Sequence, residues 1–331
     1  MINKEAKLAD NIFDKDSVEM VPIRQGYGEG LLAAGEEDER VVALCADLTD
    51  STKTSIFSNK FPERFVEVGI SEQSMASVAS GMAAMGKIPF FSSYAMFSPG
   101  RNWEQIRTTV CYNNSNVKIA GAHAGVSVEP DGGTHQAIED IAIMRVIPRM
   151  TVVVPADATE ARKATVAAAK MEGPVYIRLA REKTPVMTTE NTPFEIGKAQ
   201  VFFTPKEGLE NKVGIIACGA LVHNAMLAAK ELEDSGIGVS VLNLATIKPM
   251  DTEAVIEFAK NTSAVVTVEE HQVSGGMGSA VAEVLAQNHP IKMKMIGVQD
   301  KFGQSGEPDE LIAHYGLDKE SIIDTVRSIV D

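Results

Sequence analysis

Polar and aromatic side chains recur directly after short apolar segments in the first 181 residues of the chain. They could bind phosphate, move protons and stack on an aromatic ring, and they are Asp47 and Ser51, Glu72, Tyr94 and Phe97, His123, and Arg181. In an open parallel sheet the ligand crevice lies beyond the carboxyl ends of the strands, where the connecting loops converge. If the apolar segments are strands of one such sheet, these side chains line one crevice.

Glu72 begins a predicted helix, because Ser71 is a plausible N-cap and apolar residues follow at helical spacing. The helix dipole alone favours an acidic residue in the first turn by about 0.3–1 kcal/mol, so this position does not by itself indicate catalysis. The stretch SMASVASGMAAMG is rich in small residues and predicts close packing at an interface, where a buried carboxylate needs a partner. Its methionines Met75, Met82 and Met85 are interpreted as core filling.

A glycine-rich loop carries two histidines and an aspartate. The segment AHAGVSVEPDGGTHQAIED places His123, Asp131 and His135 after a predicted strand. This grouping predicts a site that binds hydroxyl groups or transfers protons. The loop offers no close pair of ligands, so we expect no metal site there. The glycines of HQVSGGMGSAVAEV lack the spacing of a dinucleotide-binding turn, which argues against a nicotinamide dehydrogenase.

The segments that must position these residues alternate with helical patterns, which is typical of α/β proteins with parallel sheets. In the first part we predict strands at 41–46, 64–68, 88–92, 117–122, 151–154 and 175–179. In the second part we predict strands at 213–217, 239–244, 264–268 and 293–298, and helices near 221–233, 251–260 and 279–287. A segment rich in threonine and proline divides the two parts. We therefore predict two domains, residues 1–185 and 199–331, and a linker at 186–198.

Composition limits the partners and the compartment. The 331 residues include 31 basic and 45 acidic residues, and the net charge of -14 argues against nucleic acid or an anionic membrane as a partner. The N-terminus has no apolar signal core, and no segment approaches the roughly 18 apolar residues of a membrane span. Cys45, Cys111 and Cys218 show no metal-ligand spacing and are odd in number, so we interpret them as core thiols of a cytoplasmic protein.

With these residues in view, the chain resembles the transketolase family over nearly its whole length. The segments that carry the resemblance are ALCADLTDS, RFVEVGISEQSMASVASGMA, FFSSYAMFSPGRNWEQIR, AHAGVSVEPDGGTHQAIED, PVYIRLAR and VEEHQVSGGMGSAVAEVL. The chain is most similar to the shorter, C-terminal subunit of transketolases that are split in two. The resemblance implies a thiamine-diphosphate-binding, pyrimidine-type α/β domain followed by a smaller transketolase C-terminal α/β domain. The implied reaction transfers a two-carbon ketol unit from a ketose phosphate to an aldose phosphate.

The resemblance also implies a role for each candidate residue. Glu72 matches the glutamate that hydrogen-bonds the aminopyrimidine ring of thiamine diphosphate and favours its imino tautomer. Asp47, Tyr94 and Phe97 match residues that shape the cofactor pocket. The implied contacts to the sugar phosphate are a phosphate clamp of Arg24, Ser51 and Arg181, and a loop that binds carbonyl and hydroxyl oxygens through His123, Asp131 and His135. The two histidines and Glu72 are the implied catalytic residues.

The implied assembly follows from a missing motif. The family holds Mg²⁺ and the diphosphate through a GDG motif on a domain of its own, and no GDG occurs in this chain. The resemblance therefore implies an N-terminal transketolase subunit that supplies these contacts. Active sites in this superfamily lie between subunits, so the expected assembly is a heterotetramer of two subunit pairs. No metal ligand is assigned to the present chain.

Three alternatives remain open from the sequence. The β subunit of the first component of a 2-oxo acid dehydrogenase has a similar length and an equivalent glutamate, but usually an HSQ-type loop in place of DGGTHQ. A fragment of 1-deoxyxylulose-5-phosphate synthase shares the DG-x-THQ pattern, but it does not normally have a histidine at the position of His123. The third alternative is a regulatory partner that kept the fold without catalysis.

Overall fold

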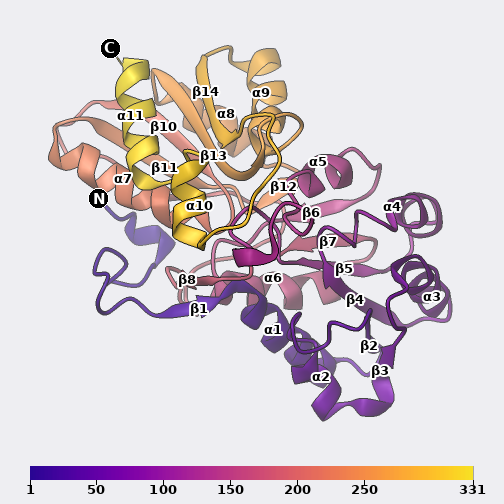
Figure 1. Cartoon of the computed structure of the whole chain (residues 1–331). Coiled ribbons are helices and arrows are strands. Elements are labelled where there is room, and N and C mark those ends of the chain that lie inside the picture. Colours follow the sequence, from indigo (N-terminus) through magenta and orange to yellow (C-terminus); the bar gives the residue numbers. More distant parts are fainter. Residues whose placement is uncertain (331) are drawn as a thin grey trace.

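Two sheets, each flanked by helices, form the two domains of the computed structural model, which describes residues 1–330 (Figure 1). The larger sheet has the strand order β12-β6-β7-β5-β4-β2-β3. Its strands are β2 (Val41–Cys45), β3 (Phe65–Glu67), β4 (Ile88–Tyr94), β5 (Lys118–Ala122), β6 (Thr151–Val153), β7 (Val175–Arg178) and β12 (Thr246–Lys248). Neighbouring strands are parallel except β12 and β6.

Helices cover both faces of this sheet, which is why its strands are near-continuous apolar runs. On one face, α1 (Ile23–Glu37) packs so closely on α6 (Ala158–Lys170) that a Cβ on Gly26 would lie 1.8 Å from the carbonyl oxygen of Ala158. The other helices of this domain are α2 (Ser55–Lys60), α3 (Glu72–Ala84), α4 (Trp103–Gln105), a π-helical segment (Ile106–Cys111), α5 (Asp140–Arg145) and 3₁₀ turns at Pro62–Arg64 and Glu129–Asp131.

The second domain has a smaller sheet with the order β14-β13-β10-β11-β9, in which only β9 is antiparallel to its neighbour. Its strands are β9 (Gln200–Phe203), β10 (Asn211–Ala217), β11 (Gly238–Asn243), β13 (Ala264–Gln272) and β14 (Lys292–Val298). Its helices are α7 (Leu221–Asp234), α8 (Thr252–Lys260), α9 (Met277–Asn288), α10 (Pro308–His314) and α11 (Lys319–Val330). All ten predicted strands are present, so the predicted fold class is confirmed.

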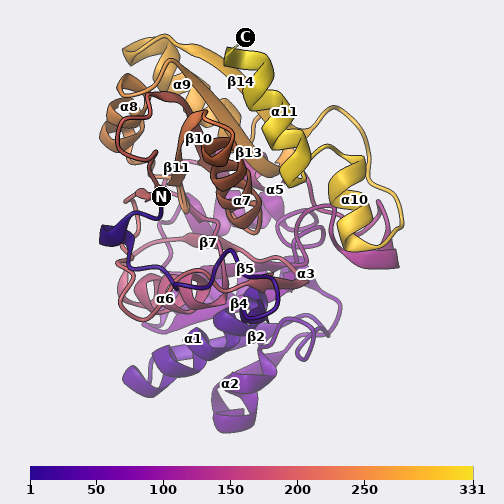
Figure 2. The same cartoon turned by 90° about the vertical axis from the view of Figure 1, so that its left-hand side faces the viewer.

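Two segments cross between the two parts, and one further strand pairing lies within the first part; the sequence indicated none of the three. The N-terminus, with its 3₁₀ turn Lys4–Ala6, runs to the second domain, where the N–H of Asn3 donates to the carbonyl of Phe202 at 2.9 Å (Figure 2). Strand β12 belongs to the later part of the sequence but extends the first sheet. Strand β1 (Met20–Pro22) pairs with β8 (Lys183–Pro185), directly before the predicted linker.

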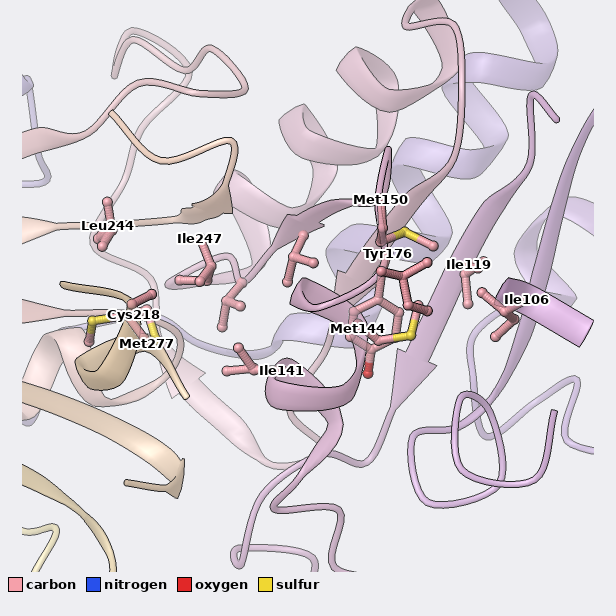
Figure 3. Packing of buried hydrophobic residues seen from close by; sticks show 14 of the residues in the cluster. Ile106, Ile119, Ile141, Met144, Met150, Tyr176, Cys218, Leu244, Ile247 and Met277 are labelled. Atoms are coloured by element: carbon pink, nitrogen blue, oxygen red, sulfur yellow. The ribbon is translucent and has the colours of Figure 1, made fainter. Parts of the chain in front are cut away.

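One apolar core continues from the first domain into the second. Figure 3 shows Tyr176 and Met144 of the first domain in the same cluster as Leu244 and Met277 of the second. The three cysteines are buried free thiols, as predicted. The domains are therefore packed against each other rather than tethered loosely. Among the described residues, every helix is too short or too polar to cross a membrane.

The predictions for Ser71 and for the methionines of α3 hold only in part. Ser71 stands at the N-cap, but its side chain makes no capping hydrogen bond. Met75 is buried as expected, whereas the side chain of Met85 is 85% exposed just beyond the end of the helix. Met85 therefore does not fill the core, and an apolar residue is left on the surface of this helix.

Candidate active site

Residues from four separate elements meet beyond the carboxyl ends of the first domain's strands. Arg24, in the first turn of α1, donates from Nη1 to the carbonyl oxygen of Ser51 at 2.8 Å. The same Nη1 lies 3.1 Å from Nε2 of His123, which follows β5. The ring of His123 stacks on that of Tyr94, at the end of β4, with centroids 3.8 Å apart. The predicted convergence of Arg24, Ser51, Tyr94 and His123 is thus present in the fold.

His123 is a buried, neutral imidazole. Burial is the main cause that lowers its pKa to about 2, and the charges of Arg24 and Arg181 and the nearby His135 lower the pKa further. Because Nε2 faces the Arg24 donor, we assign the proton to Nδ1. Within residues 1–330, Nδ1 is buried and has no hydrogen-bond partner. A buried donor of this kind fits a ligand oxygen. The backbone of His123 has a positive φ of 56°, so the loop holds the ring in an uncommon conformation.

Aromatic rings continue the cluster toward α3. Tyr94 stacks on Phe97 with centroids 6.1 Å apart and an interplanar angle of 19°. The rings of His135 and Phe97 are nearly perpendicular, with centroids 5.3 Å apart. The guanidinium of Arg101 lies 5.6 Å from the centroid of the Phe97 ring. The half-buried rings of Tyr94 and Phe97 thus provide an apolar surface that a planar heterocycle could contact.

Glu72 lies at the end of this series of contacts, in the first turn of α3. Its side chain is 2% exposed, and Nη1 of Arg101 lies 3.7 Å from Oε2. Neither Arg101 nor another described residue donates a hydrogen bond to Oε2. Asn102 donates to the backbone oxygen of Glu72 at 3.1 Å, and its own Oδ1 also has no partner among residues 1–330. Oε2 of Glu72 and Oδ1 of Asn102 are therefore buried acceptors without a donor, and a bound ligand could donate a hydrogen bond to them.

The structure places the other predicted residues less centrally. Asp47 is exposed at a φ of 58°, and its N–H donates to Oε1 of Glu67 at 2.8 Å. Asp131 is exposed at the end of the 3₁₀ turn Glu129–Asp131, within the glycine-rich loop. Arg181 donates to the carbonyl oxygen of Val128 at 3.3 Å, so it lies against the same loop.

Three further residues belong to the site but were not predicted. Arg101 and Asn102 lie in the loop after Phe97, and both contact Glu72. Glu67 accepts hydrogen bonds from Asp47, Thr49 and Gly69 and so shapes the loop after β2. A basic residue four positions after Phe97 was the available signal for Arg101.

Family models match most of the chain. The model of the transketolase pyrimidine binding domain matches residues 19–187, and that of the transketolase C-terminal domain matches residues 205–322. The chain belongs to the transketolase family. A transketolase C-terminal section of Methanocaldococcus jannaschii is 45% identical over 303 residues, which are 91% of this chain and 93% of that protein. The 6-deoxy-6-sulfo-D-fructose transketolase subunit of Clostridium sp. strain MSTE9 is 42% identical over 309 residues, 93% of this chain and 94% of that subunit.

A solved structure leads to the same conclusion. The transketolase-family chain resembles a split-gene transketolase described as an inactive beta4 tetramer, with a TM-score of 0.85 and 46% identity over 93% of this chain and 98% of that one. The match extends over both domains and nearly the full length of the split-gene protein. The prediction of a C-terminal subunit of a split transketolase is confirmed at the level of family and architecture.

Proposed function

We propose that this chain is the C-terminal subunit of a thiamine-diphosphate-dependent transketolase that moves a two-carbon ketol unit from a ketose phosphate to an aldose phosphate. The observation that carries the proposal is the buried carboxylate of Glu72, whose Oε2 has no hydrogen-bond donor within residues 1–330. Arg101 contacts both this carboxylate and the ring of Phe97, which stacks on the ring of Tyr94. A carboxylate acceptor next to aromatic faces fits an aminopyrimidine ring.

The chain's own residues divide the work on the cofactor. When bound, thiamine diphosphate supplies the acidic thiazolium carbon that carries the two-carbon unit. Glu72 accepts a hydrogen bond from the aminopyrimidine and so tunes its basicity, while Tyr94 and Phe97 flank the ring and Asp47 shapes the pocket wall. In the described part of the chain, no group of three or more His, Cys, Asp or Glu residues is arranged to hold a metal ion. We therefore assign Mg²⁺ and the diphosphate to the N-terminal subunit.

The sugar phosphate lies, in this proposal, between the two arginines and the glycine-rich loop. Arg24 and Arg181, with Ser51, bind the phosphate through charge-assisted hydrogen bonds. His123 donates from Nδ1 to a sugar oxygen as a neutral imidazole, and His135 and Asp131 bind neighbouring hydroxyl groups. Since the overall charge of -14 repels anions, this local pair of arginines has to attract the substrate.

Exposed apolar side chains on and beside α3 favour the binding of a partner subunit on this face. Ile70 and Met85 flank α3 and are 71% and 85% exposed, and Val78 on the helix is 41% exposed. Gly81, on the same exposed side, has no atom within 4 Å of the position of a Cβ, so a partner's backbone could approach there. We propose that the N-terminal subunit covers this face, in a cytoplasmic heterotetramer of two subunit pairs.

Calorimetry on the isolated chain and on the chain purified with its N-terminal subunit tests the proposal. We expect the pair to bind thiamine diphosphate with Mg²⁺ and to transfer ketol units between sugar phosphates. We expect the isolated chain to bind the cofactor weakly or not at all, because it lacks the groups that neutralise the diphosphate. Sub-micromolar, Mg²⁺-dependent binding by the isolated chain would contradict the division of the site between subunits.

A further inference from the structure

The loop that carries the two site histidines is held by the second domain as well as by the first. Its sharp conformation begins at His123 and continues to Gly125, whose φ is 99°. The N–H of Ser127 donates to Oε1 of Glu270, on β13, at 2.7 Å. A Cβ on Gly125 would lie 2.3 Å from the carboxyl carbon of Glu270. The loop backbone therefore rests directly on the Glu270 carboxylate, without room for a side chain between them.

A second segment of the same domain holds the other end of the loop. Gln136 donates from Nε2 to the carbonyl oxygen of Val126 at 2.7 Å and to that of Gln304 at 2.9 Å. The hydroxyl of Ser305 donates to the carbonyl oxygen of Pro130 at 2.9 Å. The loop is thus fixed from two sides, and His135 lies directly before one of the fixed residues.

Burial of the Glu270 carboxylate costs free energy, and the charged and polar groups around it offset only part of this cost. The residue is 4% exposed, and burial raises the pKa of its carboxyl, while the charge of Arg178 acts in the opposite direction. Arg178 itself forms its ion pair with Asp140, at 2.9 Å, and contacts only the backbone oxygen of Glu270. The side-chain oxygen of Glu270 is instead directed to the loop N–H. A buried carboxylate on a loop that carries ligand-binding residues indicates a role in holding that loop.

We propose that Glu270 is a positioning residue for the sugar phosphate: through the N–H of Ser127 it fixes the loop that places His123 and His135. The C-terminal domain thereby sets the alignment of the sugar without touching it. This inference rests on the proposed function. It assigns no part to Glu270 in activating the cofactor, which is the role of Glu72.

The test compares two substitutions of Glu270 in the two-subunit enzyme. Glu270→Ala should lower kcat/KM for the sugar phosphates by about 10–100-fold, mostly through KM, because small displacements of binding groups cost this much. Glu270→Gln retains an acceptor oxygen for Ser127, so its KM should lie much closer to the wild-type value than that of Glu270→Ala. Deuterium exchange at the thiazolium carbon should stay at the wild-type rate in both. Amide hydrogen exchange of residues 123–136 should be faster in Glu270→Ala.

Glu160→Ala is the matched control. Glu160 is also a buried carboxylate between the domains, but its oxygens accept from Ala156 and from Asn243 rather than from the loop. Its removal should lower stability and leave the sugar KM unchanged. An equal rise in KM in this control would show that Glu270 acts only through domain packing.

The remaining outcomes separate the two proposals. Wild-type KM and wild-type loop exchange in Glu270→Ala would overturn the inference and leave the proposed function intact. Absence of ketol transfer in the wild-type pair would overturn both. If Glu270→Ala does not assemble, Glu270→Asp is judged by the same measurements, since it keeps the charge near Arg178 and withdraws the oxygens from Ser127.

Discussion

Replacement of Glu72 by glutamine tests the link between this fold and thiamine chemistry. The side chain is 2% exposed, so a substitution that preserves its size should leave the packing of α3 intact. The ion pair that is lost involves Arg101, whose side chain is 56% exposed, and screening limits the contribution of such a pair to roughly 0–1 kcal/mol. We therefore expect the melting temperature of the two-subunit enzyme to change by a few degrees at most.

The catalytic loss should be far larger. An amide cannot replace the carboxylate as a charged hydrogen-bond acceptor for the aminopyrimidine, and assistance to proton transfer of this kind is worth about 10²–10⁴ in rate. Ketol transfer and deuterium exchange at the thiazolium carbon should fall together by that factor. If the only role of Glu72 is its favourable interaction with the helix dipole, Glu72→Gln should instead lower the stability by about 0.3–1 kcal/mol and leave both rates unchanged. Unchanged exchange with an intact fold would refute the role of Glu72.

Two further substitutions probe the phosphate clamp and the interior. Arg181→Ala should raise KM for phosphorylated sugars more than it lowers kcat, and steady-state kinetics with unphosphorylated sugars should show a smaller effect; equal effects would remove Arg181 from the clamp. Arg178→Met leaves the buried carboxylate of Asp140 without its cation, so the free energy of unfolding in urea should fall by about 3–5 kcal/mol. A loss near zero would show that the Arg178–Asp140 ion pair does not stabilise the fold.

Much of the fold could be predicted because its strands are buried on both faces. Residues of β2 illustrate this: Val41 and Ala43 belong to the cluster beneath α1 and α6, whereas Val42 and Leu44 face the opposite core. A strand in this position must be apolar at every residue, so it stands out in the sequence. The convergence of Tyr94 and His123 could be predicted for a related reason, since polar residues directly after such strands meet at one edge of the sheet.

The remaining features depend on contacts between residues far apart in the chain. Nothing in the local pattern of β12 indicates that it joins the first sheet rather than the second. Glu270 resembles any acidic residue at the end of a strand until its partner Ser127, far away in the sequence, is known. Arg101 likewise gains significance only from its distance to Glu72. Propensity and periodicity contain no information about such pairs.

The distribution of unsatisfied atoms explains how a split chain can fold and yet lack a complete site. The apolar core runs through both domains, so the hydrophobic contribution to folding needs no partner. Three buried polar atoms of the site, Oε2 of Glu72, Oδ1 of Asn102 and Nδ1 of His123, have no hydrogen-bond partner among residues 1–330. Each such atom costs about 1–3 kcal/mol, which a ligand that pairs with it returns on binding. The core of this chain is thus complete without a ligand, whereas the three unsatisfied atoms are available to the cofactor and sugar that we propose.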